Sequence, residues 1–561
     1  MSQIHINTIA DLCAKHGIRK AIISPGSRNA PLIIAFNRHP KIECFSISDE
    51  RSAAFIALGM AQGSQQTVAI ICTSGSAALN YAPAVAEAYF QEVPLLVITA
   101  DRPPEWIDQW DGQTIRQKGI YGQHIKASYH LPVVSQEEDS WQAYRKVNEA
   151  CIQASTGLKG PVHINIPFRE PFYPAADEKW AVDQSAAFIE HISSAFSLGK
   201  EELIRLRSEF ASYEKVAFLL GQQDYPQAFL DNLDDVSQKL QIPVYADIIS
   251  NGHSLKNAIR FTDSIGIQLQ QQVGTAYVPD LVISFGRSII SKQLKLFLRK
   301  NKVAQWHIDS YKNSIADPFS SLQKLIQTEP SNFLEEIQTT KPKANSFLDS
   351  WTTAEKEVKE LSHNFLKAQA EFNEFSALYA LMQHIPDGSQ LHLANSLSVR
   401  YINFIGSEKA DKVWCNRGTS GIDGSNSTAM GHAVIHKDQQ HILITGDVAF
   451  FYDRNAFWHK YPYDNLKVVL INNHGGSIFK MIKGPKEQQE LEDFFVTEQR
   501  SNASHLCAEF GIEYTQVNEQ KDLTPAIQAW LSDTGCSLLE IQTNSEVNQR
   551  IFESFKHNLI K

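Results

Sequence analysis

Residues 446–479 read GDVAFFYDRNAFWHKYPYDNLKVVLINNHGGSIF. An apolar run, HILIT at 441–445, comes directly before this stretch, and a second one, KVVLI at 467–471, lies within it. Short apolar runs of this kind are typical of strands buried in a parallel sheet. Asp447 and Asn473 each follow such a run, 26 residues apart, which is about the length of one strand–helix–strand crossover. The sequence therefore predicts that both side chains lie past the carboxyl ends of two parallel strands.

The side chains at those strand ends predict a metal site. Ligands of open α/β sheets bind beyond the carboxyl ends of the strands. A carboxylate, an amide oxygen and a nearby backbone carbonyl form an all-oxygen set, which suits a hard cation that holds a phosphate. The alternative is an ordinary βαβ unit whose loops contain turn-forming Asp, Asn and Gly.

The bulk properties restrict the class of protein. A chain of 561 residues predicts three or four domains, and 43% hydrophobic residues suffice for large cores. A net charge of −10 disfavours a broad nucleic-acid surface. The sequence has no apolar run long enough to cross a membrane and no signal-peptide pattern at its start, so we expect a cytoplasmic protein without membrane insertion. Seven cysteines without a CxxC pair predict reduced thiols.

Strand-like and helix-like segments alternate through three parts of the chain: residues 1–180, 185–345 and 372–561. This alternation predicts an α/β protein with three parallel-sheet domains. In the first part, the strand-like runs end in polar clusters, among them Ser27-Arg28, Asp49-Glu50 and Asp101-Arg102. Turn and cap chemistry explains some of these residues equally well.

The Gly-Asp pair followed at this distance by Asn-Asn resembles the cofactor motif of thiamine diphosphate (ThDP)-dependent enzymes. The ending NNHGGSIF narrows the resemblance to the branch of that family that acts in menaquinone biosynthesis. Further matching stretches are SPGSRNAPL (24–32), DERSAAFIALGMAQG (49–63), ITADRPPE (98–105) and NRGTSGIDG (416–424). The resemblance implies a pyrimidine-binding domain at 1–180, a central domain at 185–345 and a diphosphate-binding domain at 372–561.

The resemblance also implies how the cofactor is held. Glu50 would face N1′ of the aminopyrimidine, and Ile422 would support the bent cofactor. Gly446, Asp447 and Asn473 would hold the diphosphate, with Asp447, Asn473 and the Gly475 carbonyl as ligands of Mg²⁺ or, alternatively, Mn²⁺. The residues alone leave another interpretation of Asp49 and Glu50 open, namely a helix N-cap and a first-turn acid.

The reaction implied by the resemblance is decarboxylation of 2-oxoglutarate and addition of the resulting succinyl carbanion equivalent to isochorismate. Both substrates are dianions, so arginine is the residue best suited to bind their carboxylates. Surface charge is the alternative for each cation. Besides Glu50, the implied catalytic residues are Arg28, Gln113 and Arg102, and the implied substrate-binding residues are Ser27, Lys292, Ser396, Arg400, Arg417, Ile478 and Phe479. Gln293 stands where some family members have an arginine, which leaves open how the second substrate's carboxylates are held.

The resemblance further implies a homodimer or a dimer of dimers, with each active site shared between two chains. Two other functions remain open at this point. One is another ThDP-dependent 2-oxoacid decarboxylase or carboligase, and the other is a scaffold that binds ThDP without turnover. The absence of a GxGxxG fingerprint disfavours dinucleotide binding.

Overall fold

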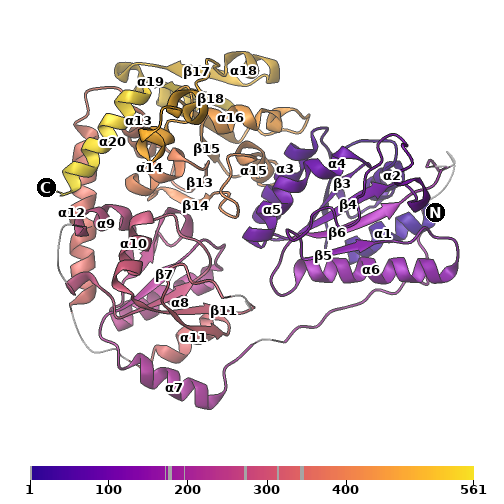
Figure 1. Cartoon of the computed structure of the whole chain (residues 1–561), viewed down its shortest axis with the longest axis horizontal. Helices are drawn as coiled ribbons and strands as arrows, with labels where there is room; N and C mark the ends of the chain where they lie inside the picture. The colour runs from indigo at the N-terminus through magenta and orange to yellow at the C-terminus, as the bar shows by residue number, and fades with distance from the viewer. Residues whose placement is uncertain are drawn as a thin grey trace.

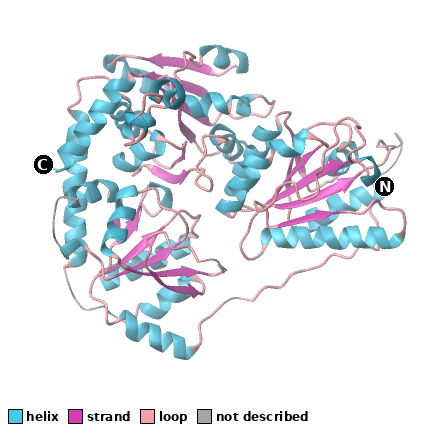
Figure 2. Ribbon diagram, viewed as in Figure 1, coloured by secondary structure: helices cyan, strands magenta, loops and turns pink. Residues whose placement is uncertain are grey.

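The computed structural model describes residues 3–170, 172–174, 180–194, 196–270, 275–311, 315–340 and 346–560. The described chain forms three six-stranded sheets whose strands are all parallel. Helices cover both faces of the sheets, and the three units lie side by side (Figure 1 and Figure 2). The predicted class, α/β with three parallel-sheet domains, is confirmed. Residues 175–179 and 341–345, near the ends of the first two expected domains, lie outside the described residues.

The first sheet has the strand order β2-β1-β3-β4-β6-β5. Its strands are β1 (Lys20–Ile23), β2 (Glu43–Ser46), β3 (Val68–Cys72), β4 (Leu95–Asp101), β5 (Ala127–His130) and β6 (Val162–Pro167). Its helices are α1 (Gln3–Lys15), α2 (Ala30–Arg38), α3 (Glu50–Ser64), α4 (Ser76–Asn80), α5 (Ala82–Gln91), the short η1 (Pro104–Trp106) and α6 (Glu137–Ser155).

The middle sheet has the order β12-β11-β10-β7-β8-β9. Its strands are β7 (Val216–Leu220), β8 (Val244–Ala246), β9 (Ala258–Ile259), β10 (Leu281–Phe285), β11 (Ala304–Asp309) and β12 (Leu322–Gln327). The helices of this part are α7 (Lys200–Phe210), α8 (Gln227–Leu240), η2 (Ile248–Ser250), α9 (Thr262–Leu269), η3 (Thr275–Tyr277), α10 (Lys292–Asn301) and α11 (Pro330–Ile337). The long α12 (Phe347–Lys367) leads to the third domain.

The third sheet has the order β14-β13-β15-β16-β18-β17, which repeats the topology of the first sheet strand for strand. Its strands are β13 (Ser389–Leu393), β14 (Ala410–Trp414), β15 (His441–Gly446), β16 (Leu466–Asn472), β17 (Glu513–Val517) and β18 (Ser537–Gln542). Its helices are α13 (Glu374–His384), α14 (Leu397–Ile405), α15 (Ser425–Ile435), α16 (Asp447–Tyr452), η4 (Arg454–Phe457), α17 (Ile478–Met481), η5 (Pro485–Glu487), η6 (Leu491–Val496), α18 (Ser504–Phe510), α19 (Gln520–Ser532) and α20 (Ser545–Ile560).

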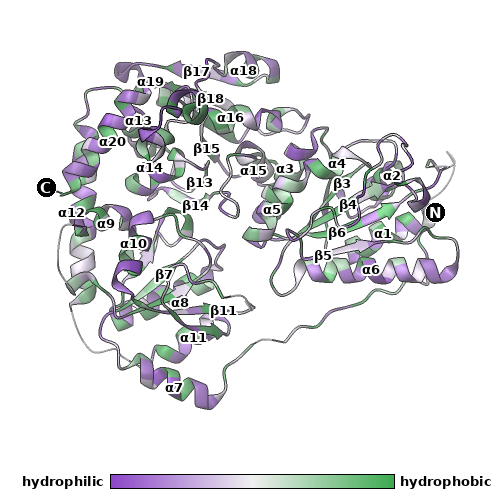
Figure 3. Cartoon of the chain, viewed as in Figure 1, coloured by the Kyte–Doolittle hydropathy of each residue, from purple (hydrophilic) through white to green (hydrophobic). Residues whose placement is uncertain are grey.

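The central strands are buried along their whole length, because helices cover both faces of each sheet. In β3, β4 and β16 every residue is buried. The apolar residues gather along these strands and the inward sides of the helices (Figure 3). All seven cysteines are free thiols, as predicted. No helix in the described chain has the length and apolar character needed to span a membrane.

Helices α3 and α15 join the first domain to the third at very close approach. A Cβ atom at Gly59 would lie 2.1 Å from the Thr428 carbonyl oxygen, and one at Gly431 would lie 2.1 Å from the Ile56 carbonyl oxygen. Glycine at both positions therefore lets the two helix backbones touch. Glu50 begins α3, so this joint helps to fix its position.

Three buried histidines lie behind the same joint. His392 of β13 and His441 of β15 are hydrogen-bonded at 3.0 Å, and His432 of α15 is 3.3 Å from the Gln62 side chain of α3. Burial lowers the pKa of all three imidazoles, to about 4 for His441, and their neighbours' charges lower it further for His392 and His432. The folded protein thus holds these rings neutral.

This histidine cluster predicts a fall in stability on mild acidification. Unfolded histidine takes up a proton below about pH 6.5, whereas the buried rings resist protonation to lower pH. The stabilisation is complete above pH 6.5 and is lost as the pH falls toward 4, at about 1.4 kcal/mol per pH unit for each histidine. We expect the melting temperature to fall between pH 7 and pH 5. His432→Gln should reduce the fall, and His557→Gln, at an exposed position, should not. Equal pH dependence in all three proteins would contradict the assignment.

Candidate active site

Asp447 and Asn473 lie past the carboxyl ends of two neighbouring central strands of the third sheet, as the sequence predicts. β15 ends at Gly446 and is paired in parallel with β16, so that Gly446 lies opposite Ile471. Asp447 is therefore close to the loop that follows Asn472. The Asp447 carboxylate is buried, which raises its pKa, while hydrogen bonds from Gln499 and from the backbone N–H groups of Val448 and Gly475 lower it.

Gln499 holds the two strand ends together. Its amide nitrogen donates to Asp447 Oδ2 at 2.8 Å and to Asn472 Oδ1 at 3.0 Å. The Asn472 amide in turn donates to Glu540 Oε1 at 2.7 Å. The sequence analysis missed Gln499, because it lies in an irregular segment after the motif and has no pattern of its own.

Glu374 is the second residue that the sequence analysis missed. Its Oε2 accepts from the Asn473 amide at 2.8 Å, and its Oε1 accepts from the Tyr401 hydroxyl at 2.7 Å. Burial, with a contribution from the Asp447 charge, raises the pKa of Glu374 to about 7. The sequence offers only an Asn-Glu pair at the start of α13, which any capped helix could have.

The backbone at Gly475 has a conformation that is unfavourable for residues other than glycine. Gly475 has φ of 151°, and a Cβ atom there would lie 2.6 Å from the Val496 carbonyl oxygen. The described residues contain no group of three His, Cys, Asp or Glu side chains placed to hold a metal. A cation here would thus be bound by one carboxylate together with amide and backbone oxygens. That set of ligands fits Mg²⁺ with diphosphate, because a bound cation would reduce the free-energy cost of burying the Asp447 charge.

Two arginines and Ser396 form a second cluster at the start of α14. Arg400 Nη1 donates to the Ser396 carbonyl oxygen at 2.6 Å, and Ser396 has φ of 72°. Arg417 Nη1 donates to the Asn395 Oδ1 at 2.8 Å, and its Nε is buried without a hydrogen-bond partner. Burial and the charge of Arg417 lower the pKa of Arg400.

The first domain helps to hold the Arg417 loop. Glu87 of α5 is buried and accepts from the backbone N–H of Gly418 at 2.7 Å and of Thr419 at 2.6 Å. Glu87 is a third residue that the sequence analysis missed, because nothing in the helical pattern distinguishes it from a surface acid.

Lys292 is exposed at the first position of α10. Burial lowers the pKa of Lys556 on α20, and the charge of Lys292 makes a smaller contribution. The neighbouring Gln293 side chain accepts from the Gln270 amide at 2.6 Å. Gln293 is therefore engaged within the middle domain.

Glu50 lies at the start of α3, half-buried and 3.4 Å from the Asn80 amide. Its neighbour Asp49 caps the helix by accepting from the Ser52 N–H at 3.0 Å. Asp49 is therefore the N-cap and Glu50 an acid of the first turn, as the alternative interpretation has it, and the Glu50 carboxylate also accepts from Asn80. Burial raises the pKa of Cys72 and Tyr81, and the charge of Glu50 adds to both shifts.

Arg28 is buried: Nη1 donates to the Phe168 carbonyl oxygen at 2.9 Å, and the guanidinium lies 4.5 Å from the centre of the Phe172 ring. Arg102 Nη2 donates to the Gly112 carbonyl oxygen at 2.7 Å. Gln113 follows with φ of 55°, and its Cα would lie 3.2 Å from a Cβ atom on Gly75. Ser27 and Gln113 are exposed.

The structure thus brings the predicted residues together in separate groups within one chain. No hydrogen bond in the described chain joins Glu50 to Asp447 or Asn473. Of the predicted apolar residues, Ile422 lies in the loop before α15, and Ile478 and Phe479 begin α17; all three are partly buried. The Phe479 ring lies 5.6 Å from that of Phe495.

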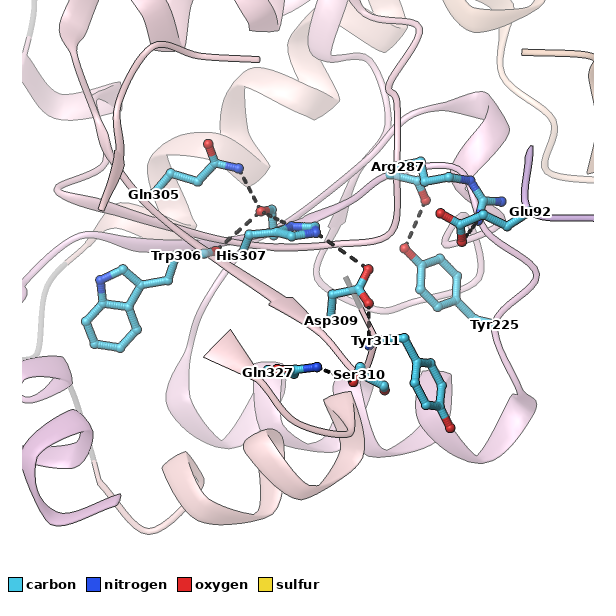
Figure 4. A network of polar contacts seen from close by, with 12 residues as sticks. Glu92, Tyr225, Arg287, Gln305, Trp306, His307, Asp309, Ser310, Tyr311 and Gln327 are labelled. Carbon is cyan, nitrogen blue, oxygen red and sulfur yellow. Dashed lines mark hydrogen bonds and ion pairs between the residues drawn. The ribbon is translucent and has the colours of Figure 1, made fainter. Parts of the chain in front are cut away.

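A cavity of about 410 Å³ lies where the three domains meet, and none of the predicted site residues lines it. At its wall, Arg287 Nη1 is 2.9 Å from Glu92 Oε2, which links the middle domain to the first (Figure 4). The Tyr225 hydroxyl donates to the Gly221 carbonyl oxygen at 2.9 Å.

Comparison with known proteins gives the family. Three family models match: the N-terminal thiamine pyrophosphate-binding domain at residues 6–120, the middle domain of thiamine pyrophosphate enzymes at 221–393, and the C-terminal binding domain at 397–541. These matches follow the order of the three sheets.

Several relatives that cover nearly the whole chain share one name, 2-succinyl-5-enolpyruvyl-6-hydroxy-3-cyclohexene-1-carboxylate synthase. The chain is 42% identical to the protein of Cytophaga hutchinsonii, over 99% of this chain and 98% of the relative. It is 38% identical to that of Flavobacterium psychrophilum, over 98% of each chain. For Porphyromonas gingivalis the identity is 36%, over 98% of this chain and 96% of the relative. The chain therefore belongs to the 2-succinyl-5-enolpyruvyl-6-hydroxy-3-cyclohexene-1-carboxylate synthase family of thiamine diphosphate-dependent enzymes.

Proposed function

We propose that this chain decarboxylates 2-oxoglutarate and adds the succinyl unit to isochorismate, giving 2-succinyl-5-enolpyruvyl-6-hydroxy-3-cyclohexene-1-carboxylate for menaquinone biosynthesis. The observation that carries the proposal is the third domain's pair of sites. One site is the group of oxygen atoms around Asp447 and Asn473, at the carboxyl ends of β15 and β16. The other is the pair Arg400 and Arg417 near the start of α14, which form no ion pair with a described carboxylate. Such an arrangement suits a diphosphate cofactor beside an anionic substrate.

The third domain would hold the cofactor's diphosphate. Asp447, the Asn473 side chain and the Gly475 carbonyl would be the ligands of Mg²⁺, with Mn²⁺ as the alternative, and Gly446 would lie against the diphosphate. When bound, ThDP supplies the electron sink for loss of carbon dioxide from a 2-oxo acid. Ile422 would support the bent cofactor.

The remaining residues would position the substrates and move protons. Glu50 would exchange a proton with the aminopyrimidine N1′, with Asn80 3.4 Å from its carboxylate. Arg28, Arg102 and Gln113 of the first domain would be catalytic residues that contact the reacting atoms. Ser27, next to Arg28, would bind substrate. Lys292, Ser396, Arg400 and Arg417 would bind carboxylates, while Ile478 and Phe479 would keep water away from the reacting carbon.

The assembly would be a cytoplasmic homodimer or a dimer of dimers. Glu50 has no hydrogen bond to the metal motif within the described chain. A shared site would instead join the pyrimidine-binding domain, residues 1–180, of one chain to the diphosphate-binding domain, residues 372–561, of another. Residues 185–345 would form the central domain. A two-fold assembly then contains two equivalent sites.

A turnover assay tests this function. The purified protein is mixed with ThDP, Mg²⁺, 2-oxoglutarate and isochorismate; loss of isochorismate is followed by absorbance and the product is identified by mass. We expect a succinyl adduct whose formation depends on both substrates. Decarboxylation without loss of isochorismate would favour another ThDP-dependent decarboxylase or carboligase. ThDP binding with no decarboxylation of any 2-oxo acid would favour a scaffold.

A further inference from the structure

Helix α10 of the middle domain is fixed against the arginine cluster of the third domain. Two buried carboxylates organise its start. Asp247 accepts from the backbone N–H groups of Ile249, Ile290 and Ser291, and Asp263 Oδ1 accepts from the Ser291 hydroxyl and the Gln293 N–H, both at 2.8 Å. Figure 1 shows α9 and α10 on the side of the middle domain that faces α14.

Asp263 also links the start of α10 to the third domain. Asp263 Oδ2 accepts from the Asn403 amide of α14 at 3.0 Å, and Asn403 Oδ1 accepts from the Ile248 N–H at 3.1 Å. Arg400 lies on α14 one turn before Asn403. The start of α10 and the arginine cluster are therefore parts of one hydrogen-bonded unit.

The Lys295 side chain lies on the side of α10 that faces this hydrogen-bonded unit. It lies one helical turn after Ser291, and residues four apart share a helix face. Ser291 points at Asp263, so Lys295 stands on the same side. Lys295 is only partly exposed; burial lowers the pKa of its ammonium group, the charges of Asp247 and Asp263 oppose that shift, and the charge of Arg417 adds to it.

Lys295, Arg400 and Arg417 have no ion pair to a carboxylate in the described residues. Asp247 and Asp263 already accept hydrogen bonds at both oxygens, and burial raises the pKa of both, to about 6 for Asp247. Three partly buried cations without an ion pair in the described residues, beside two carboxylates whose oxygens already accept hydrogen bonds, attract an anion with more than one carboxylate.

The other residues at the start of α10 are less well placed. The Gln293 side chain is bonded to Gln270, and Lys292 is exposed. Gln293 therefore brings no charge to the arginine cluster.

We propose that Lys295 is a substrate-binding residue, which together with Arg400 and Arg417 binds a carboxylate of a dicarboxylate substrate. The inference rests on the proposed function for the identity of the substrates. It answers how the carboxylates are held in a chain that has glutamine at position 293.

The test compares Lys295→Gln and Lys295→Met with Lys300→Gln. Lys300 is exposed on the same helix, so its substitution removes the same charge away from the cluster. Binding of 2-oxoglutarate and of isochorismate is measured by calorimetry on the full chain without ThDP, and KM and kcat are measured for each substrate with ThDP and Mg²⁺. Thermal melting checks folding of each variant.

We expect both Lys295 variants to weaken binding and to raise KM for one of the two substrates by about 10- to 100-fold, the effect of losing one charge-assisted contact. The turnover number kcat should change by no more than about threefold, and Lys295→Arg should restore most of the affinity. The substrate whose KM rises is the one that Lys295 binds. Lys300→Gln should behave as the unmodified protein.

The inference fails if the Lys295 variants bind both substrates as tightly as the unmodified protein, or if Lys300→Gln weakens binding equally. These outcomes are distinct from failure of the proposed function. A chain that binds a dicarboxylate through Lys295 but forms no adduct would retain the inference and lose the function. A chain that forms the adduct with unchanged KM in the Lys295 variants would retain the function and lose the inference.

Discussion

Replacing Glu50 with glutamine is expected to lower the turnover number by about 10²- to 10⁴-fold, the usual contribution of a positioned acid–base group. The glutamine side chain has the same shape and can still approach the Asn80 amide, so the packing of α3 against α15 should persist. It cannot exchange the proton that the aminopyrimidine requires. Turnover of 2-oxoglutarate and isochorismate, together with the melting temperature, measures both effects.

Asp49→Asn provides the matched control, because it removes the same charge one residue away. The asparagine oxygen can still accept from the Ser52 N–H and keep the helix cap, while the hydrogen bond from the Asn455 amide to the second oxygen is lost. We expect its turnover to stay within a few-fold of the unmodified protein. A Glu50→Gln protein that is folded and retains more than about a tenth of the turnover would remove Glu50 from the proton-transfer role.

The fold could be predicted from the sequence because its determinants are local. Runs such as HILIT and KVVLI are short, apolar and bounded by turn residues, and the strands β15 and β16 occupy them. Parallel neighbouring strands end on the same side of a sheet, so the sequence also predicted that Asp447 and Asn473 lie at the carboxyl ends of β15 and β16. The repeated strand order of the first and third sheets could not be predicted, since no residue pattern in single strands encodes which neighbours they choose.

The residues that support the site could not be predicted, because their role arises from contacts between distant segments. Gln499 reaches Asp447 from a segment 52 residues further along the chain, and Glu87 reaches the Gly418 N–H across 331 residues. Each is an ordinary polar residue in its own neighbourhood. Glu374 and Lys295 likewise read as a first-turn acid and a helix-surface lysine. Only burial and the partners brought by the fold distinguish them.

The largest effect on cofactor binding is expected from Asp447→Asn. The substitution preserves the size of the side chain and the acceptor for the Val448 N–H, but it removes the negative charge that would bind the metal. We expect Mg²⁺-dependent ThDP binding, measured by calorimetry, to weaken by at least about 100-fold, more than the 10- to 100-fold typical of a residue that acts through a ligand. Gln499→Met, which removes the hydrogen bond to Asp447, should fall in that smaller range.

The stability of the same variant, measured without cofactor, separates metal binding from folding. Burial raises the pKa of Asp447, which means that the folded protein disfavours its charged form when no cation is bound. The neutral asparagine avoids this cost but loses the hydrogen bond that the Gln499 amide donates to Asp447 Oδ2, so the melting temperature of Asp447→Asn without ThDP and metal should stay close to that of the unmodified protein. Adding ThDP and Mg²⁺ should raise the melting temperature of the unmodified protein and leave that of the variant nearly unchanged, because only a bound ligand stabilises by mass action. A variant that melts lower without ligand, yet gains as much from ThDP and Mg²⁺ as the unmodified protein, would make Asp447 a structural residue and move the metal elsewhere.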